Sequence, residues 1–341
     1  MRRLLAGLAV TIITTAACAG TGQTTLPGLQ GDGPVTAFYP TAAPDQPTQR
    51  GPFTVPLAPD AEPARGNGRL VIISHGSGGN PWVHTDLART LVAEGFIVAF
   101  PQHRGDHTGD FSTPGPESWK LRPAEVSRAI DAVAADPRFA PLLKLDKVGA
   151  FGGSAGGHTM LSLAGGRWSP GQFRRHCEAR ISDDFSSCVG FITRLSGGWL
   201  DGLKKAIALG VIRQRFDDDT WQAHADARIA AVVSAVPFAA DFDMASLAAP
   251  RIPLALVTAA RDVNQIPAFH SSAVLAACRT CEHLADLPDA SHGVMLSPMP
   301  PLPAGSIAEA LLADPPGFDR ATVVPAVQGR VVAFMRRHLL P

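Results

Sequence analysis

The sequence predicts an α/β fold in which a mostly parallel central sheet is flanked by helices. Short apolar runs bounded by glycine and proline alternate with stretches of helical spacing, a pattern typical of parallel strands joined by crossover helices. Three expected strands are followed within a few residues by a serine, an aspartate and a histidine, in that order. Because the carboxyl ends of parallel strands lie along one edge of a sheet, these side chains can meet there.

The composition indicates a soluble globular protein with a substantial core. The chain has 341 residues, of which 45% are hydrophobic and 18% charged, and one α/β domain of this size is ordinary. Thirty basic residues balance thirty acidic ones, and the sequence has no basic block and no aromatic RNA-binding motif. We therefore expect no nucleic acid partner, and the composition does not indicate an oligomeric state.

Residues 1–19 have the pattern of an export signal, with a basic start, an apolar middle and a run of small residues. Within it, Thr15 to Cys18 resembles a bacterial lipoprotein box, in which Cys18 would carry the lipid that anchors the protein to the membrane. Cleavage near Ala17 or Ala19, which would release a soluble protein, is the alternative. Both predict export to the periplasm, the cell surface or the medium. No later stretch reaches the roughly 20 apolar residues of a membrane-spanning helix.

The four remaining cysteines agree with export. Cys177 and Cys188 form one locally close pair and Cys278 and Cys281 another. Bridges within each pair are expected in an oxidising compartment, although four cysteines allow three pairings. A zinc site and a redox-active pair are less favoured, because only the second pair has C-x-x-C spacing and it lacks a thioredoxin-like context. We expect no metal ion.

The first part of the chain is expected to be irregular. Residues 20–34 are rich in glycine, threonine and glutamine without periodicity, which predicts a linker before a domain over residues 35–341. A first strand is expected over residues 35–39. Residues 41–67 are dominated by proline, glycine, alanine and aspartate, which predicts a loop with a short strand at 53–56.

A buried strand over residues 70–74 runs into a glycine-rich turn that opens with His75. Such a turn lets backbone N–H groups point inward without obstruction by Cβ atoms, as stabilising an oxyanion requires. We expect the histidine to hold the turn in place. We expect the N–H of Ser77 or Gly76 to donate a hydrogen bond to the oxyanion. Gly78 and Gly79 are expected to line the substrate pocket.

The next polar segment is a second loop. After a helix over residues 82–94 and a strand over 97–100, the loop 102–115 carries four polar side chains that could suggest a metal site: His103, Arg104, Asp106 and His107. The loop is irregular and lacks a motif such as H-E-x-x-H, so we expect a polar network at the rim of a pocket. An amphipathic helix over residues 123–135, with proline near its start, follows.

The strand over residues 148–151 ends in Gly152-Gly153-Ser154-Ala155-Gly156, a match to G-x-S-x-G. In this pattern a serine lies on a tight strand-to-helix turn with strained backbone angles, and only glycine fits two positions before and after it. The turn lifts the Ser154 hydroxyl above the sheet and offers the Ala155 N–H as an oxyanion donor. A glycine-rich turn with a solvated serine is the simpler alternative.

Residues 166–228 interrupt the alternation of strands and helices. They contain three tryptophans, the first cysteine pair, the acidic run 217–219 and an apolar helical patch around 203–212. An insertion of this length between two core strands predicts a lid over the site, and lids commonly select substrates. A decorating subdomain without substrate contact is the alternative.

Regular alternation resumes after this insertion. Strands are expected over residues 229–236, 254–258 and 282–287, with helices over 267–278 and 320–340. These strands place the candidate acid and base at strand ends.

Asp262 directly follows the second of these strands, whereas its rivals Asp241 and Asp243 lie one strand earlier. His292, in the loop after the last strand, has small residues on both sides. His270 and His283 fall within a helix and a strand, so we expect them to be structural.

These residues form a plausible catalytic set. A serine is a poor nucleophile at neutral pH unless a histidine takes its proton, and an acid must orient that imidazole and stabilise the imidazolium. Ser154, His292 and Asp262 supply the three groups. Their order in the chain, Ser, Asp, His, each after a strand, is the order expected of α/β-hydrolases.

Five segments carry a resemblance to a known family. They are Phe38-Tyr39-Pro40, the loop 74–79, GGSAGG at 152–157, VVSAVPFAADFD from Val232 and LPDASHG from Leu287. Together they resemble the dienelactone hydrolase superfamily, in particular its platelet-activating-factor acetylhydrolase-like branch. The resemblance implies an α/β-hydrolase fold with an eight-stranded mostly parallel sheet, an acyl-enzyme route and no cofactor. Dienelactone hydrolases proper use a cysteine nucleophile, so Ser154 favours an ordinary serine esterase over lactone specificity.

The sequence therefore predicts an exported serine hydrolase that cleaves carboxylic esters in small molecules or lipids. Phe238 is expected to line the acyl pocket with the glycines of the loop 76–79. A peptidase or an acyltransferase on the same fold is one alternative, because the catalytic residues are shared. A catalytically silent surface binding protein is another, because intact residues do not guarantee geometry.

Overall fold

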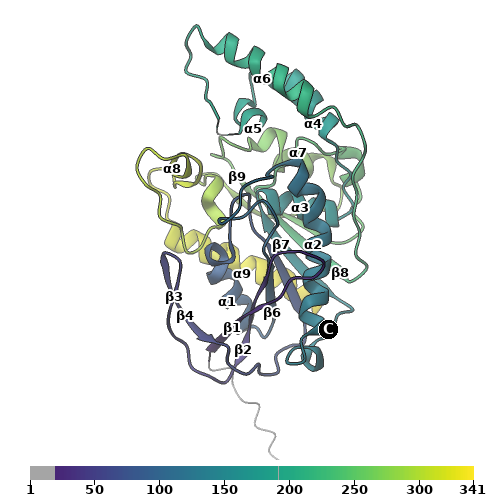
Figure 1. The fold of residues 1–341 in the computed structure, drawn as a ribbon, viewed down its shortest axis with the longest axis vertical. Helices are drawn as coiled ribbons and strands as arrows, with labels where there is room; N and C mark the ends of the chain where they lie inside the picture. Colours follow the sequence, from purple (N-terminus) through teal and green to yellow (C-terminus); the bar gives the residue numbers. More distant parts are fainter. Residues whose placement is uncertain (1–19, 191) are drawn as a thin grey trace, which may run out of the picture.

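A sheet with helices on both faces forms the fold (Figure 1). The structure, a computed structural model, describes residues 20–190 and 192–341. The strands within them are β1 Gly20–Leu26, β2 Val35–Thr41, β3 Gln46–Arg50, β4 Phe53–Pro59, β5 Leu70–Ser74, β6 Ile97–Pro101, β7 Val148–Gly153, β8 Ile229–Ala235, β9 Leu254–Ala259 and β10 Glu282–Leu287. These ten described strands pair in the order β10-β9-β8-β7-β5-β6-β2-β1-β4-β3. The six from β10 to β6 are mutually parallel, so the predicted α/β class with a mostly parallel sheet is confirmed.

Helices cover both faces of this sheet. They are α1 Thr85–Ala93, α2 Pro116–Ala135, α3 Ala155–Leu163, α4 Pro170–Arg180, α5 Phe185–Val189, α6 Asp201–Arg215, α7 Ser271–Ala277, α8 Ile307–Leu312 and α9 Arg320–Leu339. α1 and α9 pack on one face, and α2, α3 and α7 pack on the other. Along β5, Val71 and Ile73 join the first core cluster while Leu70 and Ile72 join the second. Burial of such a side chain is worth roughly 1.5–3 kcal/mol, so β5 is held from both faces.

The prediction of a linker over residues 20–34 is wrong for residues 20–26, which form β1. This strand pairs antiparallel with β2 along its whole length, from Gly20 opposite Thr41 to Leu26 opposite Val35. The Tyr39 ring covers Gly22, where an added Cβ would lie 2.1 Å from a ring carbon. Composition predicts a linker because the strand has few apolar residues, but its side chains Thr21, Gln23 and Thr24 are buried in the folded sheet.

The implied number of eight strands is also too low. Besides β1, the expected loop 41–67 contains β3, which pairs antiparallel with β4 in a hairpin. Gly51 turns this hairpin with a φ of +57°, a conformation that glycine adopts without strain. β3 lies at the edge of the sheet, where short polar sequences such as QPTQR are tolerated.

The expected helix over residues 123–135 begins about two turns earlier than predicted. α2 starts at Pro116, directly after Gly115 with its φ of +86°, and contains Pro123 in its interior. An interior proline removes one backbone hydrogen bond. The helix continues through it because Arg122 and Glu125 beside the proline are buried and make polar contacts with other segments.

The residues expected as an insertion, 166–228, form α4, α5 and α6 between α3 and β8. They lie at one end of the molecule (Figure 1). The disulfide Cys177–Cys188 joins α4 to α5, and the disulfide Cys278–Cys281 joins the end of α7 to β10. Both predicted pairings are therefore confirmed. The export signal and Cys18 lie outside the described residues, and no helix in the described part is long and apolar enough to cross a bilayer.

Three buried histidines should make the fold less stable in acid. Burial holds the pKa of His75 and His103 well below the ordinary value and lowers that of His84 to about 4. Unfolding returns each ring to water, where its pKa is about 6.5. The unfolded chain therefore binds protons that the folded chain excludes as the pH falls below about 6.5, and for His84 alone this costs ~2 kcal/mol at about pH 5.

We expect the free energy of unfolding, measured in urea, to be largest at neutral pH and to fall steadily toward about pH 4. His84→Gln, which removes one such group, should show a shallower fall than the native protein. Equal unfolding free energies at about pH 7 and about pH 5 would contradict this expectation.

Candidate active site

Ser154 lies on the turn between β7 and α3 in a strained backbone conformation. Its φ is 57° and its ψ is −119°, angles that a residue with a side chain rarely adopts. The turn is held by its neighbours, since the Ser154 N–H donates to the Ala235 carbonyl at 3.0 Å. This geometry presents the Ser154 side chain at the carboxyl edge of the sheet.

The glycines on either side of Ser154 are required by close backbone contacts. A Cβ added to Gly152 would lie 2.2 Å from the carbonyl oxygen of Gly156, and one added to Gly156 would lie 1.9 Å from that of Ser74. Both distances are far below van der Waals contact, so only glycine fits. The spacing G-x-S-x-G therefore follows from how tightly β5, β7 and α3 pack around the turn.

His292 and Asp262 complete a hydrogen-bonded chain to Ser154. His292 begins the short helix η5 (His292–Met295), and its Nε2 lies 3.0 Å from Ser154 Oγ. Its Nδ1 lies 2.7 Å from Oδ2 of Asp262, which follows β9. The three residues come from the ends of β7, β9 and β10, as parallel strands predict.

The surroundings of Asp262 keep this carboxyl group ionised. Burial by itself would raise its pKa, but the nearby His292 and the backbone N–H groups of Asn264 and Gln265 hold the pKa below the ordinary value. Both N–H groups donate to Asp262 Oδ1 at 2.9 Å. An ionised Asp262 accepts the Nδ1–H of His292, which leaves the Nε2 lone pair free for the Ser154 hydroxyl proton.

The rival acids lie elsewhere. Asp241 Oδ2 is 2.9 Å from His158 Nε2 in the buried core. Asp243 pairs with Arg167 at 2.6 Å. Only Asp262 among the three carboxylates contacts His292 in the described part of the chain.

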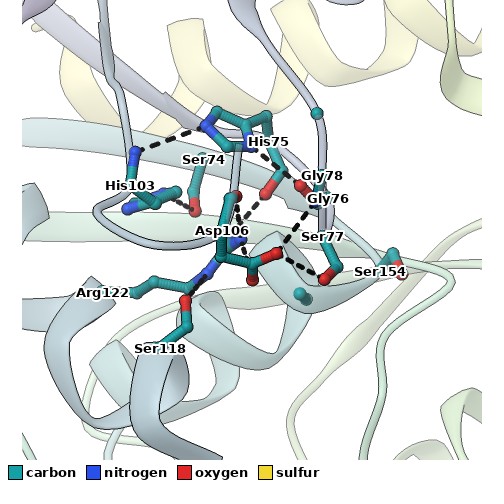
Figure 2. Close-up of polar contacts among 12 residues, drawn as sticks. Ser74, His75, Gly76, Ser77, Gly78, His103, Asp106, Ser118, Arg122 and Ser154 are labelled. Carbon is teal, nitrogen blue, oxygen red and sulfur yellow. Dashed lines mark hydrogen bonds and ion pairs between the residues drawn. The ribbon is translucent and has the colours of Figure 1, made fainter. Parts of the chain in front are cut away.

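The glycine-rich turn after β5 lies beside Ser154. The position of a Cβ on Gly76 is 3.5 Å from Ser154 Cβ, and Figure 2 shows Gly76 and Ser77 next to the serine. On the other side, Ala155 is the first residue of α3, where backbone N–H groups have no partner within the helix. The backbone of Gly76–Ser77 and that of Ala155 therefore flank the Ser154 hydroxyl.

A buried ion pair holds this turn (Figure 2). Asp106 Oδ1 accepts hydrogen bonds from Ser77 Oγ at 2.6 Å and from the Gly78 N–H at 2.9 Å. Asp106 Oδ2 accepts one from Arg122 Nη2 at 2.8 Å, and Arg122 Nη1 donates to the His75 carbonyl at 2.6 Å. Both charged side chains are fully buried. We call Asp106 and Arg122 the loop clamp.

His103 of the loop 102–115 makes a second set of buried polar contacts, whereas His107 contacts Gln102 of its own loop. His103 lies between Ser74 Oγ at 2.8 Å and Glu125 Oε2 at 2.6 Å. Burial holds the pKa of His75 well below its usual range, and its Nδ1 lies 2.8 Å from the Gly76 carbonyl. Among the described residues, no group of three or more His, Cys, Asp or Glu side chains could hold a metal ion.

Sequence reasoning missed Gln265. Its side-chain Nε2 lies 3.2 Å from Ser154 Oγ, while its backbone N–H contacts Asp262. Its Oε1 is buried without a hydrogen-bond partner. No motif marks this residue, and the only signal is its place three positions after the candidate acid.

The three expected pocket residues have different surroundings. Phe238 is buried, and its ring stacks on Trp119 at 4.6 Å and meets Phe173 of α4 edge to face at 5.4 Å. Its N–H lies 3.4 Å from the Ser154 carbonyl oxygen. Gly78 lies against the Phe111 ring, whereas Gly79 packs back on the Gly76 carbonyl of its own turn. Phe238 thus links the nucleophile turn to the insertion.

The insertion also meets the segment that carries Asp262. Ser187 of α5 donates to the Asn264 carbonyl at 2.5 Å. A surface cavity of about 260 Å³ lies between these segments. It is lined by Ser182, Asp183, Phe185, Ser186, Arg194 and Leu195 from the insertion and by Val263, Asn264 and Ile266 from the acid loop.

Comparison of the chain with models of known protein families yields no match, and comparison with curated proteins also yields none.

Proposed function

We propose that this protein is a serine hydrolase that cleaves carboxylic esters and belongs to the α/β-hydrolase superfamily. The observation that carries the proposal is the hydrogen-bonded chain in which His292 lies 3.0 Å from Ser154 Oγ and 2.7 Å from Asp262. The strained Ser154 turn and the resemblance to the dienelactone hydrolase superfamily support it. Two disulfides are compatible with the export that we also propose.

In the acylation step, Ser154 Oγ attacks the ester carbonyl carbon while its proton passes to His292 Nε2. The carbonyl electron pair moves onto oxygen, and the N–H groups of Ala155 and of Gly76 or Ser77 stabilise that oxyanion. As the oxyanion collapses, the bond to the leaving alcohol breaks and His292 returns the proton to the alcohol oxygen. Asp262 stabilises the imidazolium between the two transfers.

In the deacylation step, water attacks the acyl carbon of the Ser154 ester. His292 takes a proton from this water and gives it to Ser154 Oγ as the acyl–Oγ bond breaks, which releases the carboxylic acid. Both steps require His292 Nε2 to accept a proton. Absence of hydrolysis from neutral pH upward would count against the proposal.

Labelling with a fluorophosphonate probe tests this function, because the probe phosphonylates a serine activated by a base. We expect mass spectrometry of the labelled peptide to place the probe on Ser154, and Ser154→Ala and His292→Ala to abolish the label. A folded native protein that takes no label at Ser154 would overturn the proposal in favour of a binding protein. If the label is found on Ser154, hydrolysis of small aryl esters without hydrolysis of peptide amides would distinguish an esterase from a peptidase.

Gln265 should act mainly on deacylation. In that step the electron pair of the breaking acyl bond returns to Ser154 Oγ, to which Gln265 Nε2 lies close enough to donate, at 3.2 Å. We expect Gln265→Ala to slow steady-state hydrolysis of p-nitrophenyl acetate about tenfold. This is the effect on rate of losing one hydrogen bond to an atom that develops charge in the transition state. The initial burst of p-nitrophenolate, which reports acylation, should change much less.

Stopped-flow measurement of the burst and of the steady state on the same sample checks this expectation. Gln265→Glu, which replaces the amide donor by a carboxylate of the same length, should behave like the alanine variant. A burst rate that falls as much as the steady-state rate would show instead that Gln265 positions Ser154 in both steps.

A further inference from the structure

α6 and the residues before it expose a row of large apolar side chains. Leu203, Ile207 and Val211 follow one another at four-residue spacing and are 57%, 60% and 47% exposed. Trp199 and Leu200, just before the helix, are 90% and 41% exposed. At 3.6 residues per turn the three helical side chains lie on one side of α6, and Trp199 and Leu200 add exposed apolar surface at its start. We call these five side chains the α6 apolar face.

The opposite side of α6 holds the helix to the protein. Ile212 is buried there and joins a small core cluster with Phe173 of α4 and the disulfide Cys177–Cys188. Lys205 donates to Ser182, which lies between α4 and α5. α6 therefore needs no contact through its apolar face to stay in place, and the described residues do not cover that face.

Cations border the α6 apolar face. The helical period places Lys204 and Arg215 along one border and Arg213 along the other. Lys204 contacts Asp201 at 3.1 Å and Arg213 contacts Glu178 at 2.7 Å. Residues 192–216 contain five basic side chains and one acidic side chain. The acidic run that follows is paired with the rest of the protein, as Asp218 contacts Lys120 and Asp219 contacts Arg175. The exposed side of the helix is therefore apolar at its centre, and basic side chains outnumber acidic ones at its borders.

Other exposed apolar side chains lie after the carboxyl ends of strands, as Ser154 does. Phe111 follows β6, Val263 follows β9 and Ile307 follows β10, and they are 61%, 63% and 57% exposed. Trp221 is different, because the Arg167 guanidinium lies over its ring at 5.8 Å. In Figure 1, α6 and α8 both lie at the end of the molecule that contains the insertion.

We propose that the α6 apolar face binds the surface of a membrane that contains anionic lipids. Its apolar side chains would enter the boundary between headgroups and acyl chains, and the bordering cations would meet lipid phosphates. A second copy of this chain fits the face less well, because pairing two α6 helices would bring like charges together. Binding does not depend on the proposed hydrolysis, but it would bring the edge that carries Ser154 to lipid esters.

Vesicle sedimentation with the full Ser154→Ala protein tests this proposal without turnover of the lipid. We expect the protein to pellet with phosphatidylcholine vesicles that contain phosphatidylglycerol, and less with phosphatidylcholine alone or in high salt. Leu203→Gln/Ile207→Gln/Val211→Gln should reduce the partition coefficient at least about tenfold, because three apolar contacts are lost. Trp221→Gln removes an exposed aromatic outside the face and should leave partitioning unchanged.

The three substituted side chains are exposed and glutamine is a good helix former, so the triple variant should keep the native circular dichroism and melting temperature. Equal pelleting of the Ser154→Ala protein with and without the triple substitution would overturn the proposal. Failure of the Ser154→Ala protein to pellet with either kind of vesicle would also overturn it. A concentration-dependent dimer that the triple variant cannot form would identify a second copy as the partner instead. A second assay uses the native protein and the triple variant, both with Ser154 intact. Equal rates of hydrolysis of a soluble aryl ester would show that the triple variant loses membrane binding and keeps the proposed hydrolase function.

Discussion

Replacing His292 by alanine should lower kcat for a soluble aryl ester by up to ~10⁶-fold, because no other base in the described part of the chain contacts Ser154 Oγ. Asp262→Asn should cost about 10⁴-fold, since an amide in place of the carboxylate favours the wrong imidazole tautomer and does not stabilise the imidazolium. The double variant Ser154→Ala/His292→Ala should be no slower than either single variant, because the residues act as a unit.

Asp243→Asn is the matched control for this series. Asp243 follows β8 in the chain, as a rival acid would, but it pairs with Arg167 and does not contact His292. Its replacement should leave kcat unchanged within about twofold, in line with a surface ion pair. If Asp262→Asn lost less than about tenfold while Asp243→Asn lost more, the acid would have been assigned to the wrong strand.

Breaking the loop clamp should have the largest effect on stability. Arg122→Met leaves Asp106 buried without its counter-ion and removes the donor to the His75 carbonyl. Losing one partner of a buried ion pair typically costs ~3–5 kcal/mol, which denaturant unfolding will report. Asp106→Asn should have a similar cost. The double variant Arg122→Met/Asp106→Asn should cost less than the sum of the two, because no uncompensated charge remains.

The clamp should also affect catalysis through the turn that it holds. In clamp variants that fold, we expect kcat to fall by about 10²-fold with a smaller change in KM, as when an oxyanion donor is misplaced. Arg128→Met provides a control on the same helix, because Arg128 pairs with Asp32 away from the turn. It should cost about 1 kcal/mol in stability and leave kcat unchanged. A stable Arg122→Met protein with native kcat would show that the clamp does not position the turn.

Local sequence patterns were enough to predict much of this fold. Each core strand from β5 to β9 is a short apolar run, and such a run has few alternatives to a buried strand. The same reasoning found the Ser154 turn, because the two glycines that mark it, Gly152 and Gly156, lie within two residues of the serine. Local pairing also explains the two disulfides, whose cysteines are 11 and 3 residues apart.

Other features depend on contacts that the sequence pattern does not mark. β1 and β3 have weak strand sequences, and their pairing with β2 and β4 was needed to define them. α2 extends through Pro123 because tertiary contacts of Arg122 and Glu125 outweigh the proline's local preference.

For the candidate site, the sequence by itself determined which residue types follow the carboxyl ends of the core strands, because strand ends and glycine turns are local features. It therefore placed Ser154, Asp262 and His292 at one edge. Only the tertiary structure decided that Asp262 and not Asp241 meets His292, that Gln265 reaches Ser154 Oγ, and that Arg122 holds the neighbouring turn. These contacts join segments up to 111 residues apart, and side-chain distances between such segments are set by how helices and strands pack rather than by any local pattern.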